Sequence, residues 1–151
     1  MRTAAPQQYQ DTRVDVKLVL SAAWIAMVLV FAYVDIFGFY RADILDAALD
    51  GKIATTSFAA DQLFLTITLI YILVPVLMVV LSLILRPRVN RITNIAVSIL
   101  YPITIIGSCV GEHWIYYAFG SVVEVVLLTA IARIAWKWPT TQVASYSAQV
   151  P

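Results

Sequence analysis

Apolar residues gather in four long runs along the chain, separated by short segments that carry most of the charge. A bilayer core about 30 Å thick is crossed by about 20 residues of α-helix. Each run meets that length, so we expect transmembrane helices over about 18–39, 63–85, 92–110 and 114–136. The pattern therefore predicts an all-α fold, an integral membrane four-helix bundle over residues 17–138, with polar tails at 1–16 and 139–151.

Two local features refine this picture. Pro75 lies inside the second run, where it should kink the helix and leave a carbonyl for a neighbouring hydroxyl to satisfy. Between the first two runs, apolar residues fall on one side of a helix and Asp43, Asp46 and Asp50 on the other. Gly51 is well placed to end that helix. We therefore predict a short amphipathic interfacial helix in the first outer loop.

The composition excludes several classes of protein. Hydrophobic residues make up 62% of the chain and charged residues 13%, against about 25% charge in a soluble domain. The single Cys109 excludes an intrachain disulfide and a multi-thiolate metal site. His113 is the only histidine and no Glu-x-x-His spacing occurs, so we expect no metal and no cofactor. The net charge of +1, without a dense basic run, argues against a nucleic acid partner.

Basic residues are distributed unequally between the two ends of the predicted bundle. Of the ten Lys and Arg residues, Arg41 and Lys52 lie in the loop between the first and second spans. The other eight lie near the two termini or in the loop at 86–91 between the second and third spans. Positively charged loops stay on the cytoplasmic side of a membrane. We therefore expect cytoplasmic N- and C-termini, a disordered C-terminal tail, and a bacterial inner membrane as the location.

Ionisable residues inside the predicted spans are the main candidates for chemistry. Glu124 lies ten residues past Trp114, about 15 Å into the bilayer, where insertion of an acid costs on the order of 2.5–3.5 kcal/mol. Asp35 ends the first span, where a negative charge opposes the helix dipole, so Arg41 or His113 should offset it. We predict that Glu124, Asp35, Glu112 and His113 form a catalytic group near the outer face.

Aromatic and hydroxyl side chains should complete a pocket floored by Glu124. The third span carries polar residues at spacings of three and four, which gives it one polar face turned away from lipid. Seven residues are predicted to line the substrate pocket: Trp24, Tyr33, Asp61, Tyr71, Tyr101, Tyr117 and Ser121.

Each acidic candidate also has a purely structural interpretation. Asp61 and Glu112 could complement the dipoles of the helices that they precede. Glu124 could be a neutral acid that joins helices through Ser121, Tyr101 or Ser98, at about 0.6 kcal/mol per hydrogen bond. Such bonds recover less than the cost of burying the acid, and this imbalance favours a functional role for Glu124.

Four short motifs carry a resemblance to a known family. They are Tyr33-x-Asp35, Arg86-x-Arg88-x-x-Arg91-x-x-Asn94, Tyr116-Tyr117-x-Phe119-x-Ser121-x-x-Glu124 and Trp136-Lys137-Trp138, together with the central proline of the second span. Over about residues 17–138 the chain resembles a family of small four-helix membrane proteins that is catalogued only as a domain of unknown function. The resemblance implies the four-helix fold and no activity. The Glu112-His113 pair departs from the family pattern.

Three functions are compatible with these residues. The first is a non-redox acid-base enzyme, an isomerase, cyclase or epoxide-opening enzyme, acting on a lipophilic small molecule with Glu124 as the acid and Asp35 or Glu112 as the base. The second is a small proton-coupled transporter, a homodimer with Glu124 as the coupling site. The third is a structural or regulatory membrane subunit. The lipid bilayer is an expected partner in every case.

Overall fold

The computed structural model describes residues 14–54 and 58–139 of the chain. The described residues form five helices: α1 Val16–Gly38, α2 Ala42–Leu49, α3 Gln62–Ile84, α4 Pro87–Ser108 and α5 Ile115–Trp136. Together they confirm the predicted all-α four-helix bundle with a short additional helix in the first loop. The predicted tails, including the disordered C-terminal one, fall almost entirely outside the described residues.

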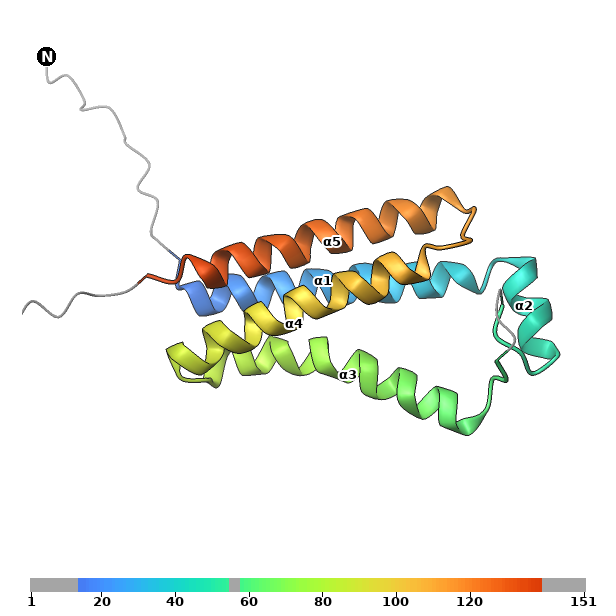
Figure 1. Ribbon diagram of the computed structural model, residues 1–151, viewed down its shortest axis with the longest axis horizontal. Coiled ribbons are helices and arrows are strands. Elements are labelled where there is room, and N and C mark those ends of the chain that lie inside the picture. Colours follow the sequence, from blue (N-terminus) through green and yellow to red (C-terminus); the bar gives the residue numbers. More distant parts are fainter. Residues whose placement is uncertain (1–13, 55–57, 140–151) are drawn as a thin grey trace, which may run out of the picture.

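The four long helices lie roughly along one axis, and α2 caps one end of them (Figure 1). We call this end the α2 end. The opposite end holds Lys17, Arg86, Arg88, Arg91, Arg133 and Lys137, and we call it the arginine end. α1 packs along α3 and α5, and α4 packs along α5, whereas α3 and α4 touch much less. In Figure 1, α3 bends away from α4 toward the α2 end.

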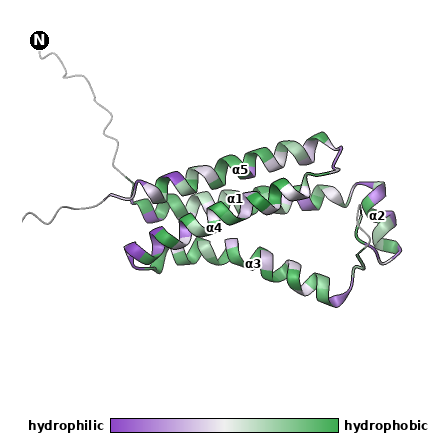
Figure 2. Cartoon of the chain, in the orientation of Figure 1, coloured by the Kyte–Doolittle hydropathy of each residue, from purple (hydrophilic) through white to green (hydrophobic). Residues whose placement is uncertain are grey.

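The outer surface of the bundle is apolar. Figure 2 shows hydrophobic residues along all four long helices and hydrophilic ones mostly at their ends and in α2. Large side chains such as Leu65, Ile99 and Val122 are 58–61% exposed on that surface, which no soluble bundle would tolerate over its full length. Each long helix has the length and composition to cross a membrane. The chain is an integral membrane protein.

A buried polar network holds the arginine half of the bundle together. The Trp24 indole N–H donates to the Asn94 side-chain oxygen at 2.7 Å, and the Asn90 amide donates to the Ser82 carbonyl at 2.6 Å. Asn94 in turn donates to the Asn90 side-chain oxygen at 2.6 Å. All four side chains are fully buried. The network joins α1, α3 and α4 because hydrocarbon offers no other partner for these groups.

The helix α3 contains Pro75, and the structure compensates for it as predicted. Proline has no N–H, so the carbonyl of Tyr71, four residues earlier, loses its helical donor. The Tyr101 hydroxyl on α4 donates to that carbonyl at 2.6 Å, and the two tyrosine rings stack with centroids 4.7 Å apart. This contact and the Tyr71–Thr104 hydroxyl pair are the last described hydrogen bonds between α3 and α4 before the two helices separate toward the α2 end.

Helix ends follow local sequence signals. The Lys17 ammonium group donates hydrogen bonds to the Leu83 and Leu85 carbonyls at the C-terminus of α3, where a positive charge complements the helix dipole. α4 begins at Pro87, five residues before the predicted span, because proline fits the first turn of a helix. α2 ends before Gly51, whose φ of 68° favours glycine.

Helices α1 and α5 approach each other closely at Gly120. A Cβ atom placed at this position would overlap the Val34 side chain. Val34 is β-branched and therefore stiff, so only glycine allows this separation of the two helices. The close contact seals the seam between α1 and α5 beside Asp35 and Ser121.

Candidate functional site: an acidic cavity between the helices

A cavity of about 540 Å³ lies between all four long helices in the half of the bundle nearer α2. Its walls are mainly apolar and aromatic, with a few polar groups aimed inward, which is the usual make-up of a small-molecule site. The lining residues are Phe31, Val34, Asp35, Ile53, Phe64, Ile67, Thr68, Tyr71, Thr104, Ile105, Ser108, Tyr117, Ser121 and Glu124.

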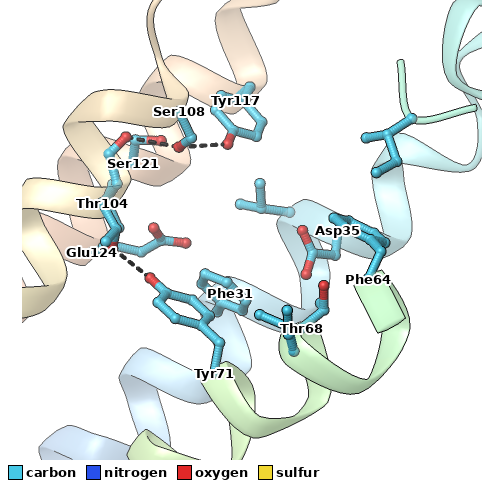
Figure 3. A pocket seen from close by; sticks show the side chains of 14 residues that line it. Phe31, Asp35, Phe64, Thr68, Tyr71, Thr104, Ser108, Tyr117, Ser121 and Glu124 are labelled. Carbon is cyan, nitrogen blue, oxygen red and sulfur yellow. Dashed lines mark hydrogen bonds between the residues drawn. The ribbon is translucent and has the colours of Figure 1, made fainter. Parts of the chain in front are cut away.

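Two carboxyl groups face each other across this cavity. Glu124 projects from the middle of α5 and Asp35 from the last turn of α1 (Figure 3). Glu124 is only 3% exposed, whereas Asp35 is open to the cavity and its mouth. Among residues 14–54 and 58–139, no lysine, arginine or histidine lines the cavity. The site therefore concentrates acidic groups in a low-dielectric space without a balancing cation.

Neither carboxyl group is tied up by the surrounding protein. Among the described residues, neither Glu124 nor Asp35 has a hydrogen bond or an ion pair. Every fully enclosed polar side-chain atom in the described part of the chain has a partner, so the Glu124 oxygens must open onto the cavity. The expected partners of Asp35 are engaged elsewhere or distant, since Arg41 binds Asp43 and Glu112.

The interpretation of Glu124 as a hydrogen-bonded link between helices does not fit this geometry. The Ser98 hydroxyl donates to the Asn94 carbonyl of its own helix, and the Tyr101 hydroxyl donates to the Tyr71 carbonyl. Ser121 lines the cavity without a bond to the carboxyl. Glu124 is thus buried inside the bundle without a hydrogen bond that would stabilise the fold.

Hydroxyl pairs border the cavity on its α4 side. The Tyr71 hydroxyl lies 2.6 Å from the Thr104 hydroxyl, and the Tyr117 hydroxyl donates to the Ser108 hydroxyl at 2.9 Å (Figure 3). Phe31 lies against the Tyr71 ring, with centroids 6.1 Å apart. Aromatic faces and hydroxyls can accommodate a polar group that develops positive character on an otherwise apolar ligand.

The cavity ends toward the arginine end at a closed layer of side chains. Trp24, Met27, Met78 and Leu128 are each at most 1% exposed and fill the space below Phe31 and Glu124. The buried polar network of Trp24 and Asn94 occupies the same layer. None of these four side chains lines the cavity, which therefore stops short of the arginine end.

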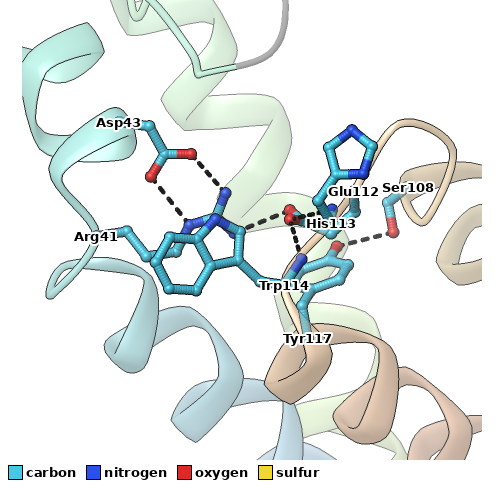
Figure 4. A network of polar contacts seen from close by, with 7 residues as sticks. All are labelled: Arg41, Asp43, Ser108, Glu112, His113, Trp114 and Tyr117. Carbon is cyan, nitrogen blue, oxygen red and sulfur yellow. Dashed lines mark hydrogen bonds and ion pairs between the residues drawn. The ribbon is translucent and has the colours of Figure 1, made fainter.

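At the α2 end the cavity widens into a vestibule of about 400 Å³. The two spaces share Val34, Asp35, Ile53, Ser108 and Tyr117, and the vestibule reaches Arg41 and Glu112. Arg41 is 4% exposed and binds both Asp43, at 2.6 Å, and Glu112, at 2.9 Å, while its guanidinium lies 4.8 Å from the Trp114 ring centroid (Figure 4). This ion-pair cluster ties α2 to the α4–α5 loop.

The cluster fixes the charge state of its members. Hydrogen bonding to Asp43 is the main reason that the pKa of Arg41 is raised, against the opposing effect of burial. The same bond lowers the pKa of Asp43. Burial alone would raise the pKa of Glu112, but Arg41 and the backbone N–H groups of His113 and Trp114 outweigh it and lower that pKa. Glu112 therefore stays ionised and structural in this arrangement.

The structure separates the predicted site residues into two sets. Asp35, Tyr71, Tyr117, Ser121 and Glu124 line the cavity together. Glu112 lies in the vestibule wall, bound to Arg41, and the exposed His113 ring points away from that cluster in Figure 4. Asp61 is exposed and caps α3, because its carboxylate accepts the Phe64 N–H at 2.8 Å. These last three residues do not face the acidic cavity.

Three predicted lining residues lie away from the cavity. Trp24 is fully buried in the polar network of the arginine half, because its indole N–H needs a partner inside the bilayer. Tyr101 is 3% exposed and supports α3 behind Tyr71. Tyr33 is 57% exposed and borders a separate apolar hollow of about 320 Å³ on the other side of α1 and α5.

Several lining residues were not predicted from the sequence. They include Phe31, which precedes Asp35 by one helical turn, and Phe64 and Thr68, which precede the predicted Tyr71 by seven and three residues along α3. These spacings place each set on one helical face. The signal was present, but in a helix that is apolar on all sides it does not stand out from lipid-facing positions.

The fold and the cavity together define a class: small four-helix integral membrane proteins with an acidic, aromatic pocket between the helices. The chain belongs to the family of unknown function DUF6326, whose pattern covers residues 8–145, and the resemblance noted in the sequence is confirmed. No curated protein and no solved structure matches the chain.

Proposed function

We propose that this protein binds a lipophilic small molecule in the acidic cavity and transforms it by non-redox acid-base chemistry. Isomerisation, cyclisation and epoxide opening all belong to this class. One observation carries the proposal: Glu124 and Asp35 face each other across the cavity without a hydrogen bond or cation to satisfy them. Such a pair is costly to keep in a membrane unless it acts on a ligand.

The two carboxyl groups take different roles because their surroundings differ. Glu124 is enclosed, which keeps its carboxyl group protonated and able to act as a general acid, whereas Asp35 at the cavity mouth ionises more readily and can accept a proton. In an isomerisation, Glu124 gives its proton to one ligand carbon or oxygen and Asp35 removes a proton from another carbon. Water in the vestibule then returns the proton from Asp35 to Glu124, so that the protein regains its starting state.

The proposed orientation follows from the basic residues, which crowd the arginine end. The termini and the arginine end face the cytoplasm of a bacterial inner membrane, and the cavity belongs to the outer leaflet. A proton-coupled transporter is the second candidate, since Glu124 lies mid-span and faces no cation. The closed layer at Trp24 and Met78 favours the enzyme, because transport needs access from both sides.

Solvent deuterium provides a test that does not require the substrate to be known. Purified protein in lipid nanodiscs is incubated in D₂O with a bacterial lipid extract, and the lipids are then surveyed by mass spectrometry. The proposal predicts protein-dependent deuterium uptake, or addition of D₂O, in one lipophilic compound. Glu124→Gln and Asp35→Asn should abolish it, and Asp61→Asn, an exposed helix cap, should not.

Other outcomes would contradict the enzyme. Unchanged labelling in Glu124→Gln and Asp35→Asn would remove both residues from the reaction. An absence of labelling, combined with uptake of a lipophilic compound into vesicles driven by a pH gradient, would identify a transporter instead. The absence of both activities would leave a structural or regulatory subunit.

A further inference from the structure

The seam between α3 and α4 is open over the half of the bundle that contains the cavity. All described hydrogen bonds between these helices involve Tyr71 or residues nearer the arginine end. Between Gln62 and Ile70, α3 has no described hydrogen bond to α4. Figure 1 shows the two helices diverging over this stretch.

Two side chains mark the edges of this opening. Ile67 on α3 lines the cavity and is also 57% exposed at the outer surface. Thr104 on α4 likewise lines the cavity and is exposed. Large exposure of cavity-lining residues on two helices that diverge at this point indicates that the cavity communicates with the surroundings of the bundle. At this depth the surroundings are lipid chains, so the cavity opens sideways into the bilayer.

The other three seams offer less space beside the cavity. Gly120 packs against Val34 between α1 and α5. The Tyr117 hydroxyl bonds to Ser108 between α5 and α4. Between α1 and α3 a hollow beside Asp35 and Pro75 measures about 80 Å³, against about 540 Å³ for the cavity itself. In the described structure the α3–α4 seam, where the two helices diverge, is therefore the wider lateral route to the carboxyl groups.

We infer that the ligand is a membrane-dissolved amphiphile that enters the cavity sideways between α3 and α4. Its single apolar tail stays in the seam against Ile67 and the neighbouring lipid, while its polar end lies between Glu124 and Asp35. The inference deepens the proposed function by naming its substrate class, and it rests on that function for the identity of the site.

The lining also selects the polar end of the amphiphile. Two carboxyl groups, with no cation among the described lining residues, repel an anionic head, so fatty acids and anionic phospholipids are excluded from the reactive position. Hydroxyls on Tyr71, Tyr117 and Ser121 suit an uncharged head that carries a hydroxyl, ether or carbonyl oxygen. A cavity of about 540 Å³ is too small for a two-tailed lipid but holds the end of a single chain.

Cysteine labelling tests the route directly. A Ser121→Cys thiol is placed in the cavity in a Cys109→Ser background, and the protein is reconstituted in phosphatidylcholine vesicles. N-dodecylmaleimide, which partitions into the bilayer, should label this thiol faster than a sulfonated, water-soluble maleimide. Ile67→Trp should slow labelling by N-dodecylmaleimide several-fold, because the indole narrows the seam.

Leu65→Trp is the matched control. Leu65 lies two residues from Ile67 on the same helix and is 60% exposed, but it does not line the cavity. It should leave the labelling rate unchanged. If Ser121→Cys does not fold, Thr68→Cys, which lines the cavity from α3, provides the same readout.

Two results would overturn the inference. Faster labelling by the sulfonated maleimide would place the access route at the vestibule, and equal slowing by both tryptophan substitutions would remove the seam from the route. Neither result affects the deuterium test, which uses no substitution at the seam. If the wild-type protein showed no deuterium uptake but the labelling still depended on the seam, the acid-base function would be contradicted. The inference that lipophilic molecules enter the cavity through the seam would stand.

Discussion

At the residue scale, the protein treats its acidic side chains in two opposite ways. Asp43 and Glu112 surround the buried Arg41, and each makes a short ion pair with it. Glu124 and Asp35, deeper in the membrane where charge is more costly, have no such partner in the described structure. Asp43 and Glu112 stabilise the fold, whereas burying Glu124 and Asp35 without a partner costs folding free energy.

This contrast predicts stability changes of opposite sign. Glu124→Leu removes an unsatisfied carboxyl group from the bundle and should raise the thermal stability of the detergent-solubilised protein while abolishing activity. Glu112→Leu leaves Arg41 with one partner fewer in a buried position and should lower stability, by about 3 kcal/mol. Thermal unfolding followed by circular dichroism measures both. A destabilised Glu124→Leu variant would mean that Glu124 is a structural residue after all.

The Arg41 cluster should also make stability depend on pH in a defined direction. The pKa of Glu112 is lower in the folded protein than in an unfolded chain, so its contribution is fully present above the unfolded value and is lost as pH falls through the folded value. Below about pH 4, where ordinary glutamates take up protons, the wild type should therefore lose stability more steeply than Glu112→Gln. Parallel curves of melting temperature against pH for the two proteins would contradict this account.

At the scale of elements, α3 is the helix that opens the cavity. Pro75 frees the Tyr71 carbonyl, Tyr101 satisfies it, and beyond that point α3 leaves α4. The remaining helices pack closely by means of Gly120 and the buried Asn94 network. Pro75 and the Tyr101 hydroxyl thus lie at the boundary between the tightly packed half of the bundle and the half that contains the cavity.

A double-mutant cycle tests this coupling. Tyr101→Phe should cost about 1 kcal/mol in the wild-type background, because it leaves a carbonyl unsatisfied inside the membrane. In the Pro75→Ala background the alanine N–H can bond to the Tyr71 carbonyl, so the same substitution should cost almost nothing. Unfolding by titration with a denaturing detergent gives the four stabilities. Equal costs in both backgrounds would show that the Tyr101 hydroxyl does not compensate for the N–H that Pro75 lacks.

At the scale of the whole molecule, the arrangement of the helices was the most predictable property. Hydrophobic length alone indicates four spans, and the Asp43-Asp46-Asp50 pattern with Gly51 indicates α2. Such signals are strong because every helix that crosses the bilayer must have about 20 apolar residues and must satisfy its own backbone hydrogen bonds.

The composition of the cavity was only partly predictable. Glu124 and Asp35 stand out because acids are rare in spans, and the structure brings them to one cavity. Trp24 and Tyr33 are aromatic like several true lining residues, yet the rotation of α1 turns one into the packed core and the other outward. That rotation is set by long-range contacts such as Trp24 with Asn94 and Gly120 with Val34, which a single sequence does not reveal.

The most direct test of the central claim is an experimental density map of the protein in lipid nanodiscs, at a resolution that shows side chains. We predict elongated non-protein density whose polar end lies between Glu124 and Asp35 and whose tail leaves past Ile67, and we expect it to be absent in Glu124→Leu. A map in which α3 closes onto α4, with the two carboxyl groups bonded to protein and no space between them, would contradict the account.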